Sequence, residues 1–116
     1  MTARILIVDD LPTNLKLLEA KLTNEYYDVV LAKSGHEALE ILKYDQKFDV
    51  VLLDVMMPEM DGFEACRLIK ANPVTANMPI IMVTAPDFRS FWIEQALKAF
   101  VYKGFGFLGT TLNSIY

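Results

Sequence analysis

Three acidic residues stand where predicted strands end, and they are the residues of this chain best placed to do chemistry. Asp9 and Asp10 follow the apolar run ILIV, and Asp54 follows VVLL. The carboxyl ends of neighbouring parallel strands form a shared crevice, so the three carboxylates are expected to meet there. Like charges in one small site repel each other unless a cation holds them, and Mg2+ prefers such oxygen ligands. The pattern therefore predicts a Mg2+ site suited to phosphoryl chemistry.

Asp54 is the predicted nucleophile of that chemistry. A carboxylate is expected to be ionised at pH 7, so it can attack phosphorus without a general base, and the reaction needs mainly positioning and charge neutralisation. Asp9 and Asp10, one strand away, can hold the cation without blocking the approach to Asp54. A DD pair after a strand is by itself often only a polar strand end or a helix N-cap. Its combination with Asp54 favours the metal site.

Short apolar runs that alternate with stretches of helical period must position these carboxylates. Strands are predicted at 4–8, 28–32, 50–53 and 79–83. Helices are predicted behind Pro12 (Leu15, Leu18 and Leu22 inward), at 35–42 (Ala38, Leu39 and Leu42 inward) and around Phe63, Cys66, Leu68 and Ile69. This alternation implies an α/β fold with a doubly wound parallel sheet.

Other residues near these elements have simpler interpretations. His36 is read as a solvated surface residue and Cys66 as a small core residue. Met56, Met57 and Met60 are read as local packing. Gly62 is available for positive φ in the connection after the third strand.

Length and composition limit the possible functions. The 116 residues suit one domain over 1–116, and 53% apolar with 22% charged residues can build one core. A net charge of −4 argues against direct nucleic-acid binding. Cys66 is the only cysteine, the start of the chain does not resemble a signal peptide, and no apolar run approaches the ~20 residues of a membrane helix. We therefore expect a cytoplasmic protein without a membrane partner.

The segments RILIVDD, VVLLDVMMPEMDGF and PIIMVTA, in this order, resemble the receiver domain of two-component response regulators. The segment DLPTNLKLLEAKLTNEY is most similar to the first receiver of PleD-type diguanylate cyclases, and no cyclase domain is expected in this chain. The resemblance covers 1–85, whereas 86–116 diverge. It implies a flavodoxin-like, five-stranded sheet of order 2-1-3-4-5. It also implies transfer of a phosphoryl group from a histidine kinase or phosphotransfer protein to one aspartate, with Mg2+ as cofactor.

The resemblance also implies roles for single residues. Asp54 resembles the phosphoacceptor and a metal ligand, Asp10 the direct metal ligand, Asp9 the holder of metal-bound water, Met56 the ligand through its backbone carbonyl, and Thr84 the switch hydroxyl that binds a phosphoryl oxygen. Self-catalysed phosphotransfer and autodephosphorylation would be the only enzyme activity.

Residues 86–116 depart from the family pattern. Most of the aromatic residues of the chain lie here, but few of its charged ones. In the segment AFVYKGF, Lys103 is the candidate phosphate-binding lysine and Phe100 the candidate switch aromatic, although Gly104 stands in place of the proline that follows the family lysine. Glycines at 104, 106 and 109 break the helical period, so the last helix of the family can be missing, while TTLNSIY favours turn or strand.

Two function classes remain open. The first is a phosphorylatable, Mg2+-dependent receiver that switches a protein interaction surface. The second is a degenerate or truncated receiver that serves as a dimerisation module. An aspartyl-type phosphatase is disfavoured, because its second aspartate would stand where Met56 is. The aromatic residues of the last quarter predict a homodimer, since apolar side chains left in water favour a partner.

Overall fold

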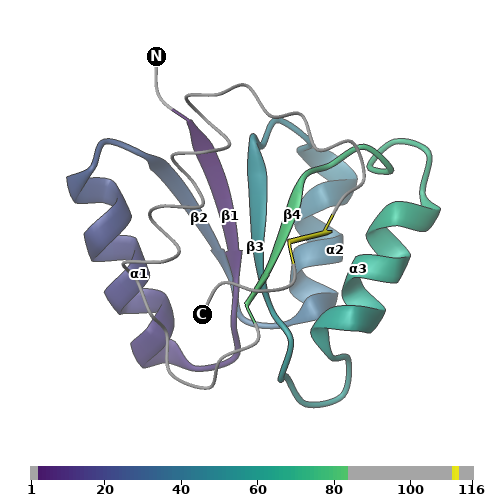
Figure 1. Cartoon of the computed structure of the whole chain (residues 1–116), viewed down its shortest axis with the longest axis horizontal. Coiled ribbons are helices and arrows are strands. Elements are labelled where there is room, and N and C mark those ends of the chain that lie inside the picture. The colour runs from purple at the N-terminus through teal and green to yellow at the C-terminus, as the bar shows by residue number, and fades with distance from the viewer. Residues whose placement is uncertain (1–2, 84–110, 113–116) are drawn as a thin grey trace.

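The computed structural model describes residues 3–83 and 111–112, which form a parallel sheet with helices on both faces (Figure 1). In chain order the elements are β1 (Arg4–Val8), α1 (Pro12–Asn24), β2 (Asp28–Ala32), α2 (Gly35–Tyr44), β3 (Val50–Asp54), α3 (Gly62–Ala71), β4 (Ile80–Val83) and β5 (Thr111–Leu112). The strand order is β2-β1-β3-β4-β5, and every neighbouring pair is parallel. The predicted flavodoxin-like α/β fold of order 2-1-3-4-5 is confirmed.

The register of the sheet brings the carboxyl ends of its strands to one edge. Val8 of β1 pairs with Leu53 of β3, so the residues that come next, Asp9 and Asp54, lie at the same edge. The Asp9 N–H donates to the carbonyl oxygen of Ala32 at 3.1 Å, which continues the contact between β1 and β2 beyond the last strand residue. The edge that carries the acidic residues is therefore fixed by backbone pairing.

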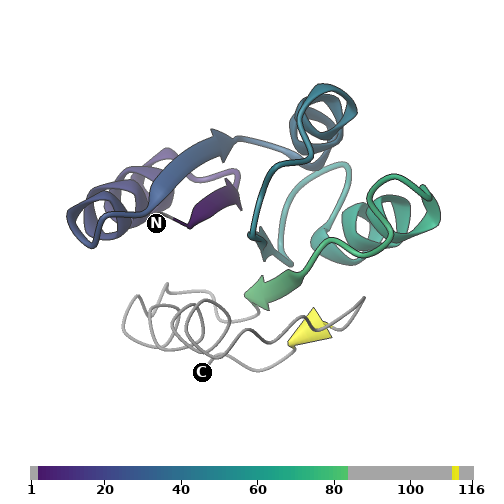
Figure 2. The ribbon, with the colours of Figure 1, turned by 90° about the horizontal axis from the view of Figure 1, so that it is seen from above.

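An apolar core lies on each face of the sheet. α1 covers one face, and α2 and α3 cover the other (Figures 1 and 2). Side chains alternate along a strand, so Ile5 and Ile7 pack on the α1 side while Leu6 and Val8 pack on the α2 and α3 side. The helices bury Leu15, Leu18 and Leu22 of α1, Ala38 and Leu42 of α2, and Ala65 and Ile69 of α3.

The predicted helices and strands are confirmed to within two residues at each end. Phe63 is 60% exposed, because Ala65 and Ile69 occupy the inward face of α3. Cys66 is only half-buried beside the core that α2 and α3 cover. His36 is exposed, as predicted.

Side chains determine where two of the helices begin, whereas α1 begins differently. Ser34 Oγ accepts the N–H of Glu37 at 3.0 Å, and Asp61 Oδ1 accepts the N–H of Glu64 at 2.8 Å. These are N-caps, which satisfy backbone donors of the first turn. α1 has Pro12 at its start and no side-chain cap from its N-cap residue, Leu11. The Leu11 N–H instead donates a hydrogen bond to the side chain of Asp9, before the helix.

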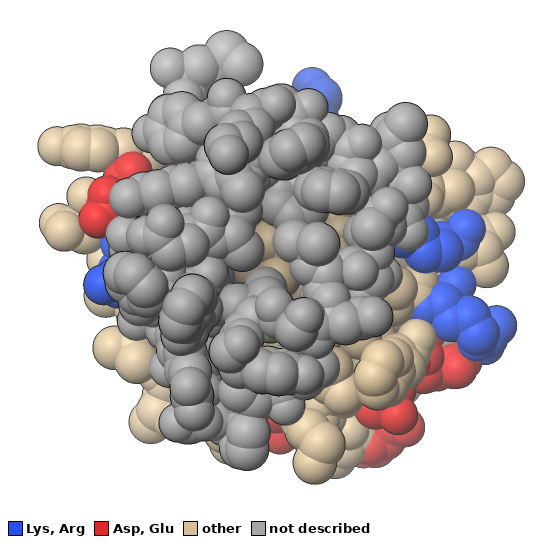
Figure 3. Space-filling model, in the orientation of Figure 1, with Lys and Arg blue, Asp and Glu red and all other residues tan. Residues whose placement is uncertain are grey.

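The described surface shows mixed charge. On the face seen in Figure 3, the described basic residues lie at the margin, and those at its left and right sides are close to acidic ones. Within residues 3–83 and 111–112, no helix is long and apolar enough to cross a membrane.

The end of α1 places a large residue in a glycine conformation. The N–H of Tyr27 donates to the carbonyl of Leu22, and the N–H of Tyr26 donates to that of Thr23. This is a Schellman motif, in which the penultimate position adopts positive φ and is usually glycine. Here that position is Tyr26, with φ of 68° and 85% exposure. The strain is therefore not offset by burial of the Tyr26 ring.

We expect Tyr26→Gly to raise the free energy of unfolding by roughly 0.5–1 kcal/mol, because glycine adopts positive φ without a Cβ clash. Tyr44 offers a matched control, since it is 82% exposed but ends α2 in helical conformation. Tyr44→Gly should lower the free energy of unfolding by a similar amount. Urea denaturation measures both, and a destabilised Tyr26→Gly would contradict the interpretation.

Candidate phosphoacceptor and metal site

The three predicted carboxylates come together at the carboxyl edge of the sheet. One oxygen from each of Asp9, Asp10 and Asp54 lies within 4.8 Å of the others. Asp9 is fully buried, whereas Asp10 and Asp54 are half-buried. Asp9 and Asp10 follow β1, and Asp54 is the last residue of β3, so two neighbouring strands supply the whole cluster.

Two donors from the start of α1 hold the buried carboxylate of Asp9. The Leu11 N–H donates to Asp9 Oδ1 at 2.8 Å, and the Asn14 side-chain amide donates to Asp9 Oδ2 at 3.3 Å. Asn14 was not predicted as a site residue. The signal for it in the sequence is an amide in the first turn of a helix that begins two residues after the acidic pair, where a side chain can point back toward that pair.

The connection after β3 folds against Asp54. The Met56 N–H donates to Asp54 Oδ1 at 3.1 Å, and the Val55 N–H donates to the Val83 carbonyl at 3.1 Å. The Gly62 N–H then returns to the Val55 carbonyl at 2.9 Å. These contacts hold Asp54 between the end of β4 and the start of α3.

Gly62 is required by close approach and not by positive φ, so that prediction was wrong. A Cβ at Gly62 would lie 2.3 Å from the carbonyl oxygen of Asp54, which no side chain can tolerate without backbone movement. Positive φ occurs instead at Glu59, in the same connection, with φ of 67°. The absence of a side chain at Gly62 lets α3 start against the strand that carries Asp54.

The three methionines of this region differ in their packing. Met57 and Met60 are buried, as the local-packing prediction requires, but Met56 is 73% exposed and that prediction was wrong for it. The described interaction of Met56 with the site is through its backbone. The predicted role of Met56 is to ligate the metal through its backbone carbonyl. That role does not need the side chain, so the exposure of the side chain is compatible with it.

The electrostatics of the cluster differ from the prediction that Asp54 is simply ionised. Burial, and next the negative charge of Asp9, raise the pKa of Asp54 from 3.8 to about 7, against the lowering effect of the Met56 N–H. Burial also raises the pKa of Asp9, while the hydrogen bonds from Leu11 and Asn14 lower it. Without a cation, a substantial fraction of Asp54 is therefore protonated at neutral pH.

The donor set fits a hard divalent cation. All three groups offer carboxylate oxygens, which Mg2+ prefers. One oxygen of each lies within 4.8 Å of the others, so the three residues would hold one small cation between them. Positive charge at this place would favour the ionised form of each carboxylate.

Part of the predicted site lies outside the described residues. Thr84, Phe100 and Lys103 are in this group, as are the aromatic residues of the last quarter and the presence of a last helix. β5, at Thr111–Leu112, lies within the segment TTLNSIY, for which turn or strand was predicted.

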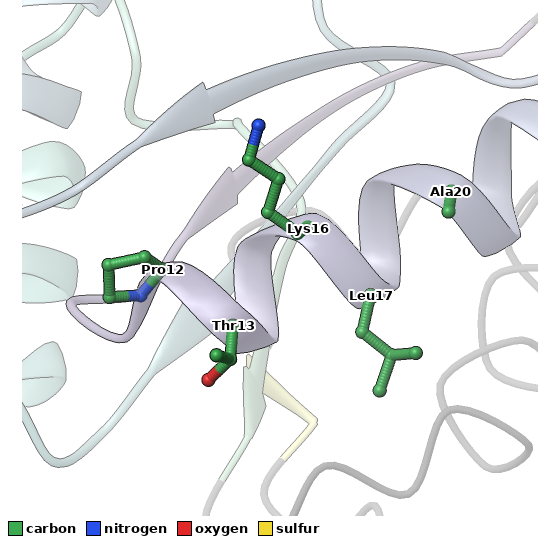
Figure 4. Close-up of a pocket in the computed structure, with 5 residues that line it drawn as sticks. All are labelled: Pro12, Thr13, Lys16, Leu17 and Ala20. Atoms are coloured by element: carbon green, nitrogen blue, oxygen red, sulfur yellow. The ribbon is translucent and has the colours of Figure 1, made fainter.

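A shallow concavity of about 480 Å³ lies on the outer side of α1 (Figure 4). Its described lining residues are Pro12, Thr13, Lys16, Leu17 and Ala20. Thr13 and Leu17 point to the same side of the helix, and Leu17 is 55% exposed. The lining of this apolar surface begins at Pro12, which is two residues after Asp10 in the chain.

The fold and the site define an open parallel α/β domain with an acidic cluster at its carboxyl edge, and comparison with known proteins identifies the family. The family model of the response regulator receiver domain matches residues 5–108. The chain belongs to the response regulator receiver domain family. The resemblance drawn from the motifs is confirmed, and the match extends beyond residue 85, where the motif resemblance ends.

Two individual proteins with similar sequences illustrate the match. The chain is 53% identical over 94 residues to the response regulator PleD of Caulobacter vibrioides, covering 81% of this chain and 20% of PleD. It is 41% identical over 102 residues to a probable cyclic di-GMP phosphodiesterase of Vibrio cholerae, covering 85% of this chain and 23% of that protein. The chain thus spans about a fifth of the length of these relatives, and the similarity concerns one segment of each.

A solved structure gives the same fold. The receiver domain of the sensor histidine kinase PA1611 from Pseudomonas aeruginosa matches with a TM-score of 0.76 and 26% identity, over 84% of this chain and 96% of that one. That structure was solved with a magnesium ion coordinated in its active site cleft.

Asp54→Asn should measure the cost of ionising Asp54 in the folded chain, which burial and next the charge of Asp9 impose. The pKa of folded Asp54 lies above its ordinary value of 3.8, so its contribution to stability is present at low pH and is lost as pH rises through about 7. Asparagine cannot release that proton. We therefore expect the difference in melting temperature, Asp54→Asn minus the unmodified chain, to increase from about pH 4 to about pH 8 when both are measured in EDTA.

Asp61→Asn is the matched control, because Asp61 is exposed and asparagine is an equally good N-cap. Its melting temperature relative to the unmodified chain should vary much less over this range. A difference for Asp54→Asn that stays constant with pH would show that Asp54 does not hold a proton in the folded state.

Proposed function

We propose that this chain is a phosphorylatable receiver of a two-component system, which accepts a phosphoryl group on Asp54 with Mg2+ as cofactor. The observation that carries the proposal is the cluster itself: Asp54 ends the central strand β3 with its carboxylate beside Asp9 and Asp10. Membership of the receiver family supports the same role. The donor would be the phosphohistidine of a histidine kinase or phosphotransfer protein, in the cytoplasm.

The described residues engage one oxygen of the nucleophile. The Met56 N–H donates to Asp54 Oδ1 at 3.1 Å, so Oδ2 would be the attacking oxygen. Attack by a carboxylate oxygen of Asp54 forms a phosphorus–oxygen bond while the phosphorus–nitrogen bond of the donor breaks, and the imidazole leaves with that electron pair. Bound Mg2+ would supply positive charge that neutralises the carboxylates and the phosphoryl oxygens.

The remaining site residues have proposed roles that complete this chemistry. Asp10 and Asp54 would ligate Mg2+ directly, Asp9 would hold a metal-bound water, and the Met56 carbonyl would be a further ligand. The hydroxyl of Thr84 and the ammonium of Lys103 would bind phosphoryl oxygens. Movement of Thr84 toward the phosphoryl group would then change a protein interaction surface.

The test is intact-mass measurement after incubation with acetyl phosphate and Mg2+. The unmodified chain should gain one phosphoryl group, and Asp54→Asn should gain none. Asp61→Asn, an exposed N-cap outside the cluster, should behave as the unmodified chain does. An adduct that persists in Asp54→Asn would show that another residue accepts the phosphoryl group.

The exposed apolar surface of α1 favours a protein, and not only a small molecule, as the donor of the phosphoryl group. A partner that delivers a phosphoryl group to Asp54 must cover the surroundings of the site, and the exposed apolar face at Leu17 lies within the first two turns of α1. Burial of such a side chain in the centre of an interface contributes to affinity. We therefore assign this face to contact with the donor protein.

Leu17→Ser should slow phosphoryl transfer from a histidine-containing phosphotransfer protein by roughly tenfold, while the rate with acetyl phosphate stays unchanged. Val74→Ser provides the control, because Val74 is 68% exposed and follows α3 near the opposite edge of the sheet. If Leu17→Ser slows transfer equally with both donors, the substitution has damaged the site itself. If it slows transfer with neither donor, the apolar face of α1 does not contact the donor protein.

The alternative function is a degenerate receiver that acts as a homodimerisation module. It rests on the sequence of residues 86–116, which is rich in aromatic residues and poor in charge. We propose a homodimer through this segment for both functions. Light scattering at high micromolar concentration should give a dimer mass in the unphosphorylated state, and a monomer mass there would contradict the homodimer.

A further inference from the structure

We propose that Asn14 is a positioning residue of the metal site, which orients the carboxylate of Asp9 for the cation. The inference rests on the proposed function, because it assigns a residue to the Mg2+ site proposed there. It adds a side chain from α1 to a site otherwise built from the ends of two strands.

The geometry around Asp9 supports this assignment. Asp9 is fully buried, and its oxygens are held from one side by two donors, the Leu11 N–H at 2.8 Å to Oδ1 and the Asn14 amide at 3.3 Å to Oδ2. One donor to each oxygen fixes the plane of the carboxylate group. The remaining lone pairs are then available toward Asp10 and Asp54, where the cation would lie.

Loss of the Asn14 bond would leave this plane poorly defined. The terminal torsion of an aspartate is broad, so a single donor at Oδ1 does not prevent the carboxylate from rotating. Rotation would redirect the lone pairs of Oδ2 without removing the carboxylate. A ligand or water-binding group that is present but misdirected weakens a metal site, as is general for groups that orient metal ligands.

The chemical type of residue 14 also fits this role. An amide donates a hydrogen bond without charge, so it orients Asp9 and leaves the negative charge that attracts the cation. A carboxylate at this position would add a fourth like charge, and a lysine would compete with the cation for the same oxygens. Asn14 is the third residue of α1, and its described side-chain hydrogen bond goes to Asp9.

The experiment is calorimetric titration with MgCl2 of the full chain and three variants, together with their melting temperatures in EDTA. Asn14→Leu keeps the size of the side chain but removes the donor, and should weaken Mg2+ binding by roughly 10- to 100-fold. Asn14→Gln keeps an amide and should recover part of the affinity. Asn24→Leu, the same change at an exposed position near the end of α1, should leave Kd unchanged.

The outcomes separate the possible roles of Asn14. A structural role alone would lower the melting temperature in EDTA without changing the Kd for Mg2+, and that result would overturn the proposal. If the unmodified chain binds no Mg2+, both this inference and the proposed cofactor fail; if it binds and Asn14→Leu binds equally well, only the inference fails. If Asn14→Leu does not fold, Asn14→Ala, which also removes the donor, takes its place in each comparison.

Discussion

Repulsion among three carboxylates at one edge of the sheet is the constraint on which the rest of the site depends. Parallel pairing of β1 and β3 in a register that sets Val8 beside Leu53 brings Asp9 next to Asp54. The pairing is held by strands that are almost entirely buried on both faces, so the acidic residues cannot move apart without losing core contacts. The apolar core therefore stabilises an arrangement of charges that is unfavourable by itself.

Among the described residues, neutral donors limit this cost. They include the backbone N–H groups of Leu11 and Met56 and the side-chain amide of Asn14. Such donors lower the pKa of the group they contact, yet burial dominates and the pKa of Asp54 still rises to about 7. A lysine or arginine in their place would satisfy the carboxylates permanently. Neutral donors leave a local excess of negative charge that a divalent cation can neutralise.

The sequence was sufficient to predict the elements and the acidic cluster, because both depend on local pattern. Apolar runs of strand length and leucines at helical spacing located β1 to β4 and α1 to α3 within two residues. The acidic residues could be placed together because the carboxyl ends of parallel strands share one edge. The features that could not be predicted depend on contacts between elements. These are the approach of Gly62 to the Asp54 carbonyl, the exposure of Phe63, the raised pKa of Asp54 and the bond from Asn14 to Asp9.

The backbone around Asp54 also offers a physical route by which the state of the site can reach the rest of the domain. One oxygen of Asp54 is held by the Met56 N–H, and the preceding Val55 N–H is bonded to the last residue of β4, Val83. The Val55 carbonyl in turn accepts the N–H of Gly62, the first residue of α3. A phosphoryl group on Asp54 would alter the first of these bonds, and the others connect that change to the end of β4 and to α3. Thr84 follows Val83 directly in the sequence, so the proposed switch hydroxyl is one residue from a strand whose end is already tied to the phosphoacceptor loop.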